Sequence, residues 1–282
     1  MLFKVVGLVA RVDEKEALKL AKKLMTHLEG KGLSVFLEPS LAKYIKKTAA
    51  ALRLEEMKVD LIITIGGDGT ILRTGLAIPK PEPPILAVNM GMRGFLTEVT
   101  PAEALEAVDK CLKGDFVLEQ CMKLSSYMGE IRLPDALNEV FITSHVPAKL
   151  LHTRIWRDNV AVAECQSDGI VVASQVGSTG YSLSGGGPVL DPKIDAFVLT
   201  PICPLTVFHP IVFSAKSTVS IELLKPEKAV VVVDGHYQMQ MGISEKRLRI
   251  RKSEYKSSFV RFDGDFYHRL KGRLLFSRGE RF

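Results

Sequence analysis

The sequence lacks the features that mark several large classes of protein. Its 282 residues carry a formal charge of only +6, and the basic residues are scattered rather than gathered with aromatic residues as in a nucleic-acid-binding surface. No cysteine belongs to a CxxC pair or has histidines at zinc spacing. We therefore expect no nucleic-acid partner, and the sequence does not identify metal ligands. We expect a cytoplasmic protein with free thiols at Cys111, Cys121, Cys165 and Cys203.

A helix able to cross a membrane is also missing from the pattern. Residues 196–215 contain no Asp, Glu, Lys or Arg and are about long enough to span a bilayer. They also contain Pro201, Pro204 and Pro210, which would break a helix repeatedly. The N-terminal apolar run has no small-residue cleavage site after it and is expected to be a strand. We expect buried strands and turns over 196–215, a first strand at the N-terminus, and no membrane partner.

Two regions of different character are present. From Lys4 to about Gly114, apolar strand patterns alternate with helical patterns, one of them over Leu41–Met57. This alternation predicts an α/β domain with a mostly parallel sheet. After Gly114 the segments are short, β-rich and separated by turn residues, which predicts an all-β, sandwich-like domain. The predicted boundaries are 1–115 for the α/β domain, 116–262 for the β-rich domain and 263–282 for a closing helix or tail.

A glycine-rich turn, TIGGDGTIL, follows the apolar strand pattern VDLIITI. Ligands of open α/β folds bind at this end of a parallel strand. The backbone N–H groups of Gly66, Gly67 and Gly69 can approach an anion without interference from Cβ atoms, and a helix opening at Thr70 adds a favourable dipole. The GxxxxGK[ST] pattern of a P-loop is absent. Asp68, among these glycines, suits the handling of a proton or a metal, although a purely structural turn remains open.

A second constellation lies in the β-rich half, in the segment DGIVVASQVGSTGYSLSGGGPVLDP that begins at Asp168. Small hydroxyl groups, open backbone and the ring of Tyr181 suit the sugar and base of a nucleotide, although an ordinary glycine-rich loop has the same composition. A serine nucleophile is disfavoured because the GxSxG pattern is missing. Further upstream, LNEV places Asn138 and Glu139 inside an apolar stretch, where polar side chains need partners.

Taken in order, these segments resemble one enzyme family. GGDGT, NMGMRGFLTE, ALNEV, DGIVVAS with GSTGYSLSGGGPV, TPICP and VDGH occur in the order and approximate spacing of the NAD kinase family, from about Val59 to Tyr237. The resemblance implies phosphoryl transfer from ATP or inorganic polyphosphate to the adenosine ribose 2′-hydroxyl of NAD, giving NADP. It also implies a divalent cation such as Mg²⁺ with the donor, a dinucleotide-binding β-rich domain, and a homodimer or homotetramer.

The resemblance also implies roles for individual residues. Asp68 matches the acidic catalytic residue, Phe95 an aromatic near the adenine, and the pair Asn138–Glu139 the group that holds the adenosine ribose hydroxyls. The implied phosphate-binding residues are Gly66, Gly67, Gly69 and Thr70. The implied NAD-binding residues are Asp68, Gly69, Phe95, Asn138, Glu139, Lys149, Gln166, Asp168, Thr179, Gly180, Tyr181, Ser182, Ser184 and His236.

Some positions depart from the family pattern, and two other functions stay open on the sequence alone. Arg93, Gln166, Val176, Gly180 and His209 differ from the residues common in the family, which affects fine specificity. A lipid kinase of the diacylglycerol type shares similar glycine turns, but the GSTGYSLS loop and the compact chain argue against it. A non-catalytic dinucleotide sensor would keep the pocket, but the retained Asp68 argues against that function.

Overall fold

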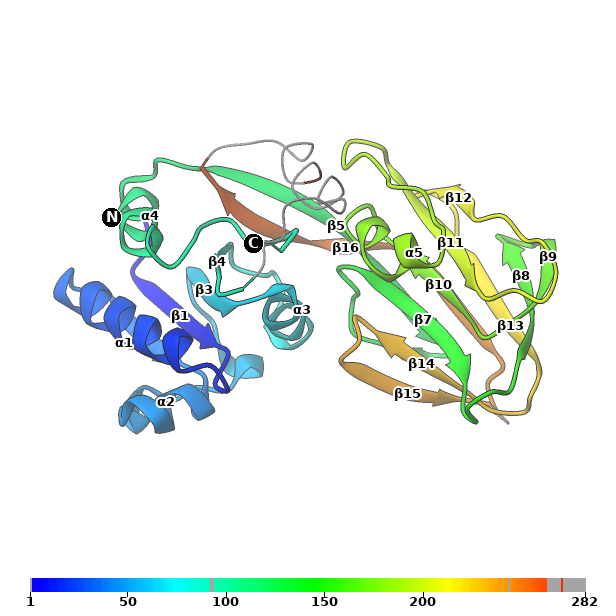
Figure 1. Ribbon diagram of the computed structural model, residues 1–282, viewed down its shortest axis with the longest axis horizontal. Coiled ribbons are helices and arrows are strands. Elements are labelled where there is room, and N and C mark those ends of the chain that lie inside the picture. The colour runs from blue at the N-terminus through cyan, green and yellow to red at the C-terminus, as the bar shows by residue number, and fades with distance from the viewer. Residues whose placement is uncertain (1, 92–93, 243, 263–269, 271–282) are drawn as a thin grey trace, which may run out of the picture. The chain divides into compact units, whose positions relative to one another are not determined.

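The computed structural model describes residues 2–91, 94–242, 244–262 and 270 (Figure 1). Its described residues form two compact units. The N-terminal unit lies within residues 1–120 and 257–282, and the C-terminal unit comprises residues 121–256. The predicted combination of an α/β domain and an antiparallel β-sandwich is confirmed. The helix predicted over 263–282 lies outside the described residues.

The N-terminal unit is built on a sheet with the strand order β2-β1-β3-β4-β16. The first four strands are β1 (Val5–Ala10), β2 (Ser34–Leu37), β3 (Leu61–Gly66) and β4 (Ile85–Asn89), and they pair in parallel. The end of β16 (Arg247–Arg261) adds a fifth strand, with Phe259 beside Ile85. Every residue of β3 is buried, as expected for a strand covered on both faces.

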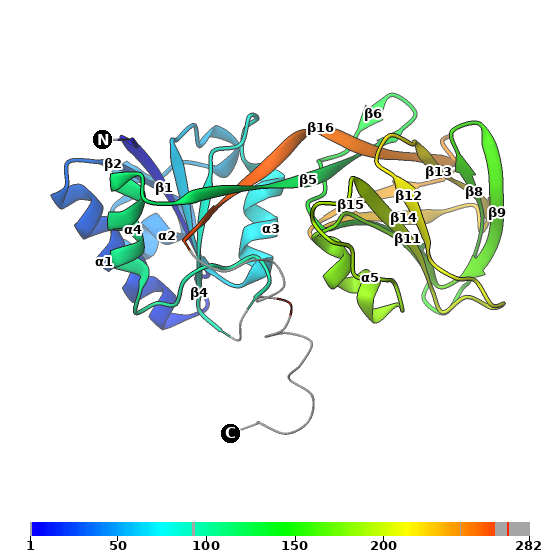
Figure 2. The same cartoon turned by 90° about the horizontal axis from the view of Figure 1, so that it is seen from above.

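Helices cover both faces of this sheet. Figures 1 and 2 show α1 (Lys15–Gly30) and α4 (Ala104–Lys113) on one side of the sheet and α3 (Asp68–Ala77) on the other. The apolar face of α1 is buried against the sheet because its apolar residues recur at helical spacing. Gly114 ends α4 in the left-handed conformation at φ 83°, as its place at the end of the helical pattern predicts.

The single helix predicted over Leu41–Met57 is wrong. Helix α2 (Pro39–Ile45) stops at Lys46, which has φ 62°, and short 3₁₀ turns follow at Thr48–Ala50 and Leu54–Glu56. Between these turns the chain pairs with the free edge of β2, where the Leu52 N–H donates to the Leu37 carbonyl at 2.9 Å. Pairing with an exposed strand edge therefore overrides the helical periodicity.

The C-terminal unit contains a six-stranded antiparallel sheet with the order β12-β11-β10-β7-β14-β15. Its strands are β7 (Glu139–Ser144), β10 (Gly169–Ala173), β11 (Ala196–Ile202), β12 (Ile211–Ser214), β14 (Ala229–Val233) and β15 (Tyr237–Met241). The uncharged stretch 196–215 forms β11, which is fully buried as predicted, and β12, in which only Phe213 is buried. Among the described residues, no helix is both long enough and apolar enough to cross a membrane.

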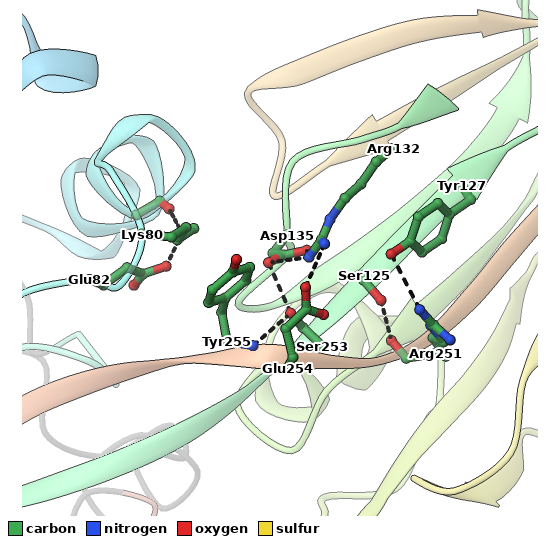
Figure 3. A network of polar contacts seen from close by, with 11 residues as sticks. Lys80, Glu82, Ser125, Tyr127, Arg132, Asp135, Arg251, Ser253, Glu254 and Tyr255 are labelled. Atoms are coloured by element: carbon green, nitrogen blue, oxygen red, sulfur yellow. Dashed lines mark hydrogen bonds and ion pairs between the residues drawn. The ribbon is translucent and has the colours of Figure 1, made fainter. Parts of the chain in front are cut away.

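The second layer of the C-terminal unit is formed by β16, β13 (Val219–Lys225), β8 (Leu151–Arg157) and β9 (Val160–Ser167), all antiparallel (Figure 2). Strand β5 (Val117–Met128) pairs with β16 and with the short β6 (Ile131–Arg132). Figure 3 shows the polar contacts that join β6 to β16. Arg132 on β6 donates to Glu254 on β16 at 2.6 Å and to both oxygens of Asp135. The buried Asp135 also accepts from the Ser253 hydroxyl at 2.9 Å, so its charge is paired.

Candidate active site

The turn at the end of β3 has an open backbone on one side and tight packing on the other. A Cβ atom at Gly67 or Gly69 would meet no atom within 4 Å, whereas a Cβ at Gly66 would collide with the Thr70 hydroxyl. Helix α3 begins at Asp68, two residues earlier than predicted, and no side chain caps it. The Thr70 N–H donates to the Gly67 carbonyl at 3.0 Å, so the start of α3 offers an anion its dipole and the open backbone of Gly67 and Gly69.

The Asp68 carboxylate is held by a neighbouring loop. One oxygen, Oδ2, accepts the Phe95 N–H at 2.9 Å, and Oδ1 accepts the Leu96 N–H at 3.1 Å. Gly94 has no room for a side chain because a Cβ there would collide with this carboxylate. An ionised carboxylate only accepts hydrogen bonds, and these two backbone donors orient it. The two glycine-containing loops thus fix Asp68 beside the open backbone.

These contacts define the local surroundings of Asp68 and Phe95. Asp68 does not cap α3 with its side chain; its carboxylate binds the loop after β4 instead. Phe95 contributes its main-chain N–H to Asp68, and its side chain is buried. Its predicted contact with the adenine remains a prediction.

In the C-terminal unit, Asn138 and Glu139 stand at the start of β7 with unsatisfied polar atoms. Asn138 Oδ1 and Glu139 Oε2 are buried and have no hydrogen-bond partner among the described residues. Burial, together with the nearby charge of Asp234, raises the pKa of Glu139 to about 7. Buried polar groups in native proteins are almost always paired, so this pair is suited to accept hydroxyl groups of a ligand.

Part of the glycine-rich loop lies beside this pair. A Cβ at Gly180 would sit 3.4 Å from Glu139 Oε2 and 3.7 Å from Asn138 Nδ2. The ring of Tyr181 packs edge-to-face on Phe141, with centroids 5.2 Å apart. Burial raises the pKa of Tyr181, and the charges of Cys203, Asp168 and Glu139 add to that rise. The structure therefore brings Asn138, Glu139, Gly180, Tyr181 and Asp168 into one neighbourhood.

Two of the predicted hydroxyl groups point back into the fold. The Thr179 hydroxyl donates to the Val176 carbonyl at 2.9 Å, and the Ser182 hydroxyl pairs with that of Thr200 at 2.8 Å. Both residues are buried, whereas Tyr181 and Ser184 are exposed. Thr179 and Ser182 thus stabilise the loop, and their contacts with NAD remain a prediction.

The remaining predicted residues are less closely joined. His236 follows the β14–β15 turn, where its Nδ1 lies 2.7 Å from the Asp234 carbonyl oxygen. Gln166 on β9 and Lys149 between β7 and β8 are exposed. In the described part of the chain, we find no hydrogen bond or ion pair that joins either side chain to the other predicted residues. Among the departures, Arg93 lies outside the described residues.

Asp234 is a residue of this neighbourhood that the sequence reasoning did not single out. Its carboxylate accepts the backbone N–H groups of Leu137, Asn138 and Glu139 at 2.7–3.0 Å. The VDGH segment could have indicated this residue, because an Asp–Gly turn there follows an apolar strand pattern. Only the fold shows its target, because the two segments are almost a hundred residues apart in sequence.

Comparisons with known proteins agree with this architecture. Family models described as the ATP-NAD kinase N-terminal domain and C-terminal domain match residues 6–116 and 137–262. The chain is 40% identical over 273 residues to an NAD kinase from Methanothermobacter thermautotrophicus, with 96% of each chain covered. It is also 40% identical to an NAD kinase from Pyrococcus abyssi, covering 95% of this chain and 98% of that protein. Among solved structures, an NAD kinase from Archaeoglobus fulgidus in complex with ATP superposes with a TM-score of 0.79 at 28% identity, covering 95% of this chain and 99% of that one.

Proposed function

The chain belongs to the NAD kinase family and phosphorylates NAD, and we propose that Asp68 is its general base. The supporting observation is the Asp68 carboxylate, fixed by two backbone N–H groups beside the open backbone of Gly67 and Gly69. Phosphoryl transfer depends mostly on positioning and charge stabilisation. A base that is already oriented meets the first of these needs.

The proposed reaction places the adenosine ribose 2′-hydroxyl of NAD against Asp68. The hydroxyl proton passes to the carboxylate as the 2′-oxygen forms a bond to the γ-phosphorus of ATP. The bond from that phosphorus to the bridging oxygen breaks, and ADP leaves with the electron pair. A general base of this kind contributes roughly 10²–10⁴-fold. The N–H groups at Gly67, Gly69 and the start of α3 would face the donor phosphates.

Glu139 and Asn138 would hold the adenosine ribose. Their buried, unpaired oxygens are acceptors that ribose hydroxyl groups can satisfy. The ionised Glu139 carboxylate can accept two hydroxyl hydrogen bonds at once. We also propose that the ring of Tyr181 and the exposed Asp168 and Ser184 contact the second nucleoside of NAD, with Lys149, Gln166 and His236 as further lining residues.

A divalent cation, Mg²⁺ in the simplest case, would accompany the donor and neutralise phosphate charge. Within the described residues, no group of three or more His, Cys, Asp or Glu side chains could hold such an ion. Mg²⁺ in kinases is usually held by one or two carboxylates together with substrate phosphates, so such a cluster is not required.

The assay combines the purified chain with NAD, ATP and Mg²⁺ and measures NADP with an NADP-specific dehydrogenase. We expect NADP to accumulate. Bound NAD without NADP would indicate a sensor, and labelled phosphate in diacylglycerol would indicate a lipid kinase. Parallel reactions with polyphosphate in place of ATP, and with NADH in place of NAD, determine the donor and the acceptor range.

We also propose that the chain forms a homodimer or homotetramer through its C-terminal unit. Two edge strands of this unit carry exposed apolar side chains: Val160 and Val162 on β9, and Val212 on β12. Leu205 and Val207, between β11 and β12, are 65% and 89% exposed. A second copy of the chain would cover such a surface with closed symmetry. A monomeric mass by light scattering at micromolar concentration would contradict this proposal.

The proposed location is the cytoplasm. None of the four cysteines forms a disulfide, and Cys111, Cys121 and Cys165 are buried. Burial raises the pKa of the Cys111 thiol to about 12 and also raises that of Cys165, so both stay protonated and unreactive. Free thiols of this kind suit a reducing compartment. Fractionation of the source cells with an antibody to the chain would test this location.

A further inference from the structure

Asp234 occupies the turn between β14 and β15 and is only 3% exposed. Its Oδ2 accepts the Leu137 N–H at 2.7 Å, while Oδ1 accepts the N–H groups of Asn138 at 2.8 Å and Glu139 at 3.0 Å. In return, the Asp234 N–H donates to the Glu139 carbonyl at 3.0 Å. One buried carboxylate thus organises three consecutive residues, two of which are the proposed ribose ligands.

The charges around this turn are few. Burial raises the pKa of Asp234, and the three backbone N–H groups and the buried Lys123 on β5 oppose that rise. The charge of Asp234 in turn adds to the effect of burial on the pKa of Glu139, which reaches about 7. Further titratable groups among the described residues are Tyr181, whose pKa is raised by burial and by the charges of Cys203, Asp168 and Glu139, and His236, whose ring nitrogen faces the Asp234 carbonyl oxygen.

A turn of this kind does not require a buried carboxylate with three hydrogen bonds. Asp158, in the β8–β9 turn of the same unit, has φ 54°, accepts one backbone N–H from Thr218 at 3.0 Å and donates its own N–H to Thr218. Asp234, with φ 48°, has the same backbone conformation. Unlike Asp158, however, it is buried and gathers three donors from a segment outside its own hairpin. A buried charge is costly, and this one is offset at the segment that presents Asn138 and Glu139.

We propose that Asp234 is a positioning residue for the NAD reaction, which presents Asn138 and Glu139 to the ribose hydroxyls through its three backbone hydrogen bonds. This inference rests on the proposed function, because it assumes that Asn138 and Glu139 hold the ribose. It has a second consequence. Since the negative charge of Asp234 lies beside Glu139, it also shifts to higher pH the range over which Glu139 becomes an ionised acceptor.

The test uses the full-length Asp234→Asn variant. Asparagine tolerates a positive φ, so the turn itself can be kept. Its amide nitrogen, however, cannot accept, and one of the three N–H groups loses its partner. The matched control is Asp158→Asn, which makes the same exchange at a similar turn remote from Glu139 in sequence. NAD dissociation constants are measured by calorimetry between pH 5.5 and 8.5, together with kcat and a melting curve.

For the wild-type chain, NAD affinity should rise with pH up to about pH 7 and then level off, because binding selects the ionised Glu139. In Asp234→Asn, affinity on the plateau should fall at least about tenfold, the loss expected for a disturbed charge-assisted contact. The midpoint of the pH profile should also move to lower pH, because a neighbouring negative charge has gone. A purely structural residue would lower the melting temperature without moving that midpoint, and Asp158→Asn should do no more than this.

An Asp234→Asn variant with the wild-type dissociation constant and the wild-type midpoint overturns the inference. If that variant does not fold, the inference is tested by amide hydrogen exchange in the wild-type chain. The N–H groups of Leu137, Asn138 and Glu139 should exchange as slowly as those of the buried strand β10, and rapid exchange overturns the inference. A wild-type chain that neither binds NAD nor forms NADP would instead refute the proposed function.

Discussion

Asp68 accepts backbone hydrogen bonds and is also the proposed acceptor of the hydroxyl proton. A substitution should therefore affect both stability and rate. In Asp68→Asn, one acceptor oxygen becomes an amide that faces the N–H of Phe95 or Leu96. We expect a loss of stability of about 1–3 kcal/mol and a fall in kcat of at least about 10². The measurements are NADP formation at saturating NAD and ATP and a melting curve of the same preparation.

The control for the stability loss is Asp60→Asn. Asp60 accepts the backbone N–H groups of Lys4 and Val5 at 2.7 and 2.9 Å in the same unit, and these bonds lower the pKa of its carboxyl group. This variant should lose some stability and keep its rate. A folded Asp68→Asn enzyme with more than about a tenth of the wild-type kcat would rule out the base role.

Glu139→Gln should raise the stability of the chain and weaken its binding of NAD. The pKa of Glu139 in the folded chain is about 7, above its usual value. The folded state therefore binds this proton more tightly than the unfolded state, and stability is lost as pH rises from about 4.5 through 7. Glutamine removes that loss, so the variant should gain stability over the wild type at pH 8, on the order of 2–3 kcal/mol, with little difference at pH 4.5.

The same variant should bind NAD more weakly by about 1–3 kcal/mol, because an amide cannot accept with both arms. Urea unfolding at pH 4.5 and 8, with calorimetric titration of NAD at pH 8, would check both halves of this prediction. Unchanged NAD affinity in a folded variant would remove Glu139 from the site.

Among single residues, the sequence predicted chemical types better than contacts. Asp68 was recognisable because a carboxylate among glycines has few uses, and Glu139 because it interrupts an apolar stretch. The contacts of both involve main-chain donors and residues distant in sequence: the Phe95 and Leu96 N–H groups donate to the Asp68 carboxylate, and the Glu139 N–H donates to the Asp234 carboxylate. No side-chain pattern marks a main-chain donor, so these contacts required the fold.

At the scale of elements, the junction between β3 and α3 makes its own prediction. Gly69→Ala adds a methyl group where nothing lies within 4 Å, in the first turn of a helix. Alanine is favoured over glycine in a helix by about 0.5–1 kcal/mol, so the melting temperature should hold or rise. If phosphates approach this backbone, the methyl group obstructs them, and kcat/KM for ATP should fall at least about tenfold.

Gly30→Ala is the matched control. Gly30 ends α1 and likewise has no atom within 4 Å of an added Cβ. The Gly30→Ala variant should show the same change in melting temperature as Gly69→Ala. Its kinetics should equal those of the wild type. Equal kinetics for the two variants would mean that the donor phosphates do not approach Gly69.

The strands of the N-terminal unit were predictable because they are continuous apolar runs buried on both faces, as in β3. The end of helix α4 was predictable from Gly114, which closes its helical pattern. The segment after α2 was not, because its pairing with Leu37 depends on which strand of the sheet has a free edge. Strand order is a property of the whole sheet and leaves no local trace in the sequence.

At the scale of the whole molecule, the N-terminal unit is assembled from two separate stretches of sequence. Arg261, at the end of β16, pairs with Glu98 at 2.9 Å, and both side chains are almost fully buried. It also pairs with Glu119 and donates to the Leu96 carbonyl at 3.0 Å. Because the Leu96 N–H donates to Asp68, this late residue supports the loop that holds Asp68.

A fragment of residues 1–120 should therefore be incomplete. Without Arg261, Glu98 is buried without its cation, which costs about 3–5 kcal/mol, a large part of the stability of an ordinary domain. The same fragment with 256–262 attached through a flexible linker should regain a cooperative transition. Differential scanning calorimetry of both fragments compares them, and an equally sharp and equally hot transition of the shorter one would contradict this prediction.

The division of the N-terminal unit also sets the order in which a ribosome can complete the two units. Residues 121–256 are synthesised before residues 257–262 exist, and at about 5–20 residues per second this interval is roughly 7–27 s. For that time β4 lacks the strand that later covers its outer side. Residues 257–262 follow the last residue of the second unit within about 0.3–1.2 s at this rate, so the loop that holds Asp68 gains its support from Arg261 only near the end of translation.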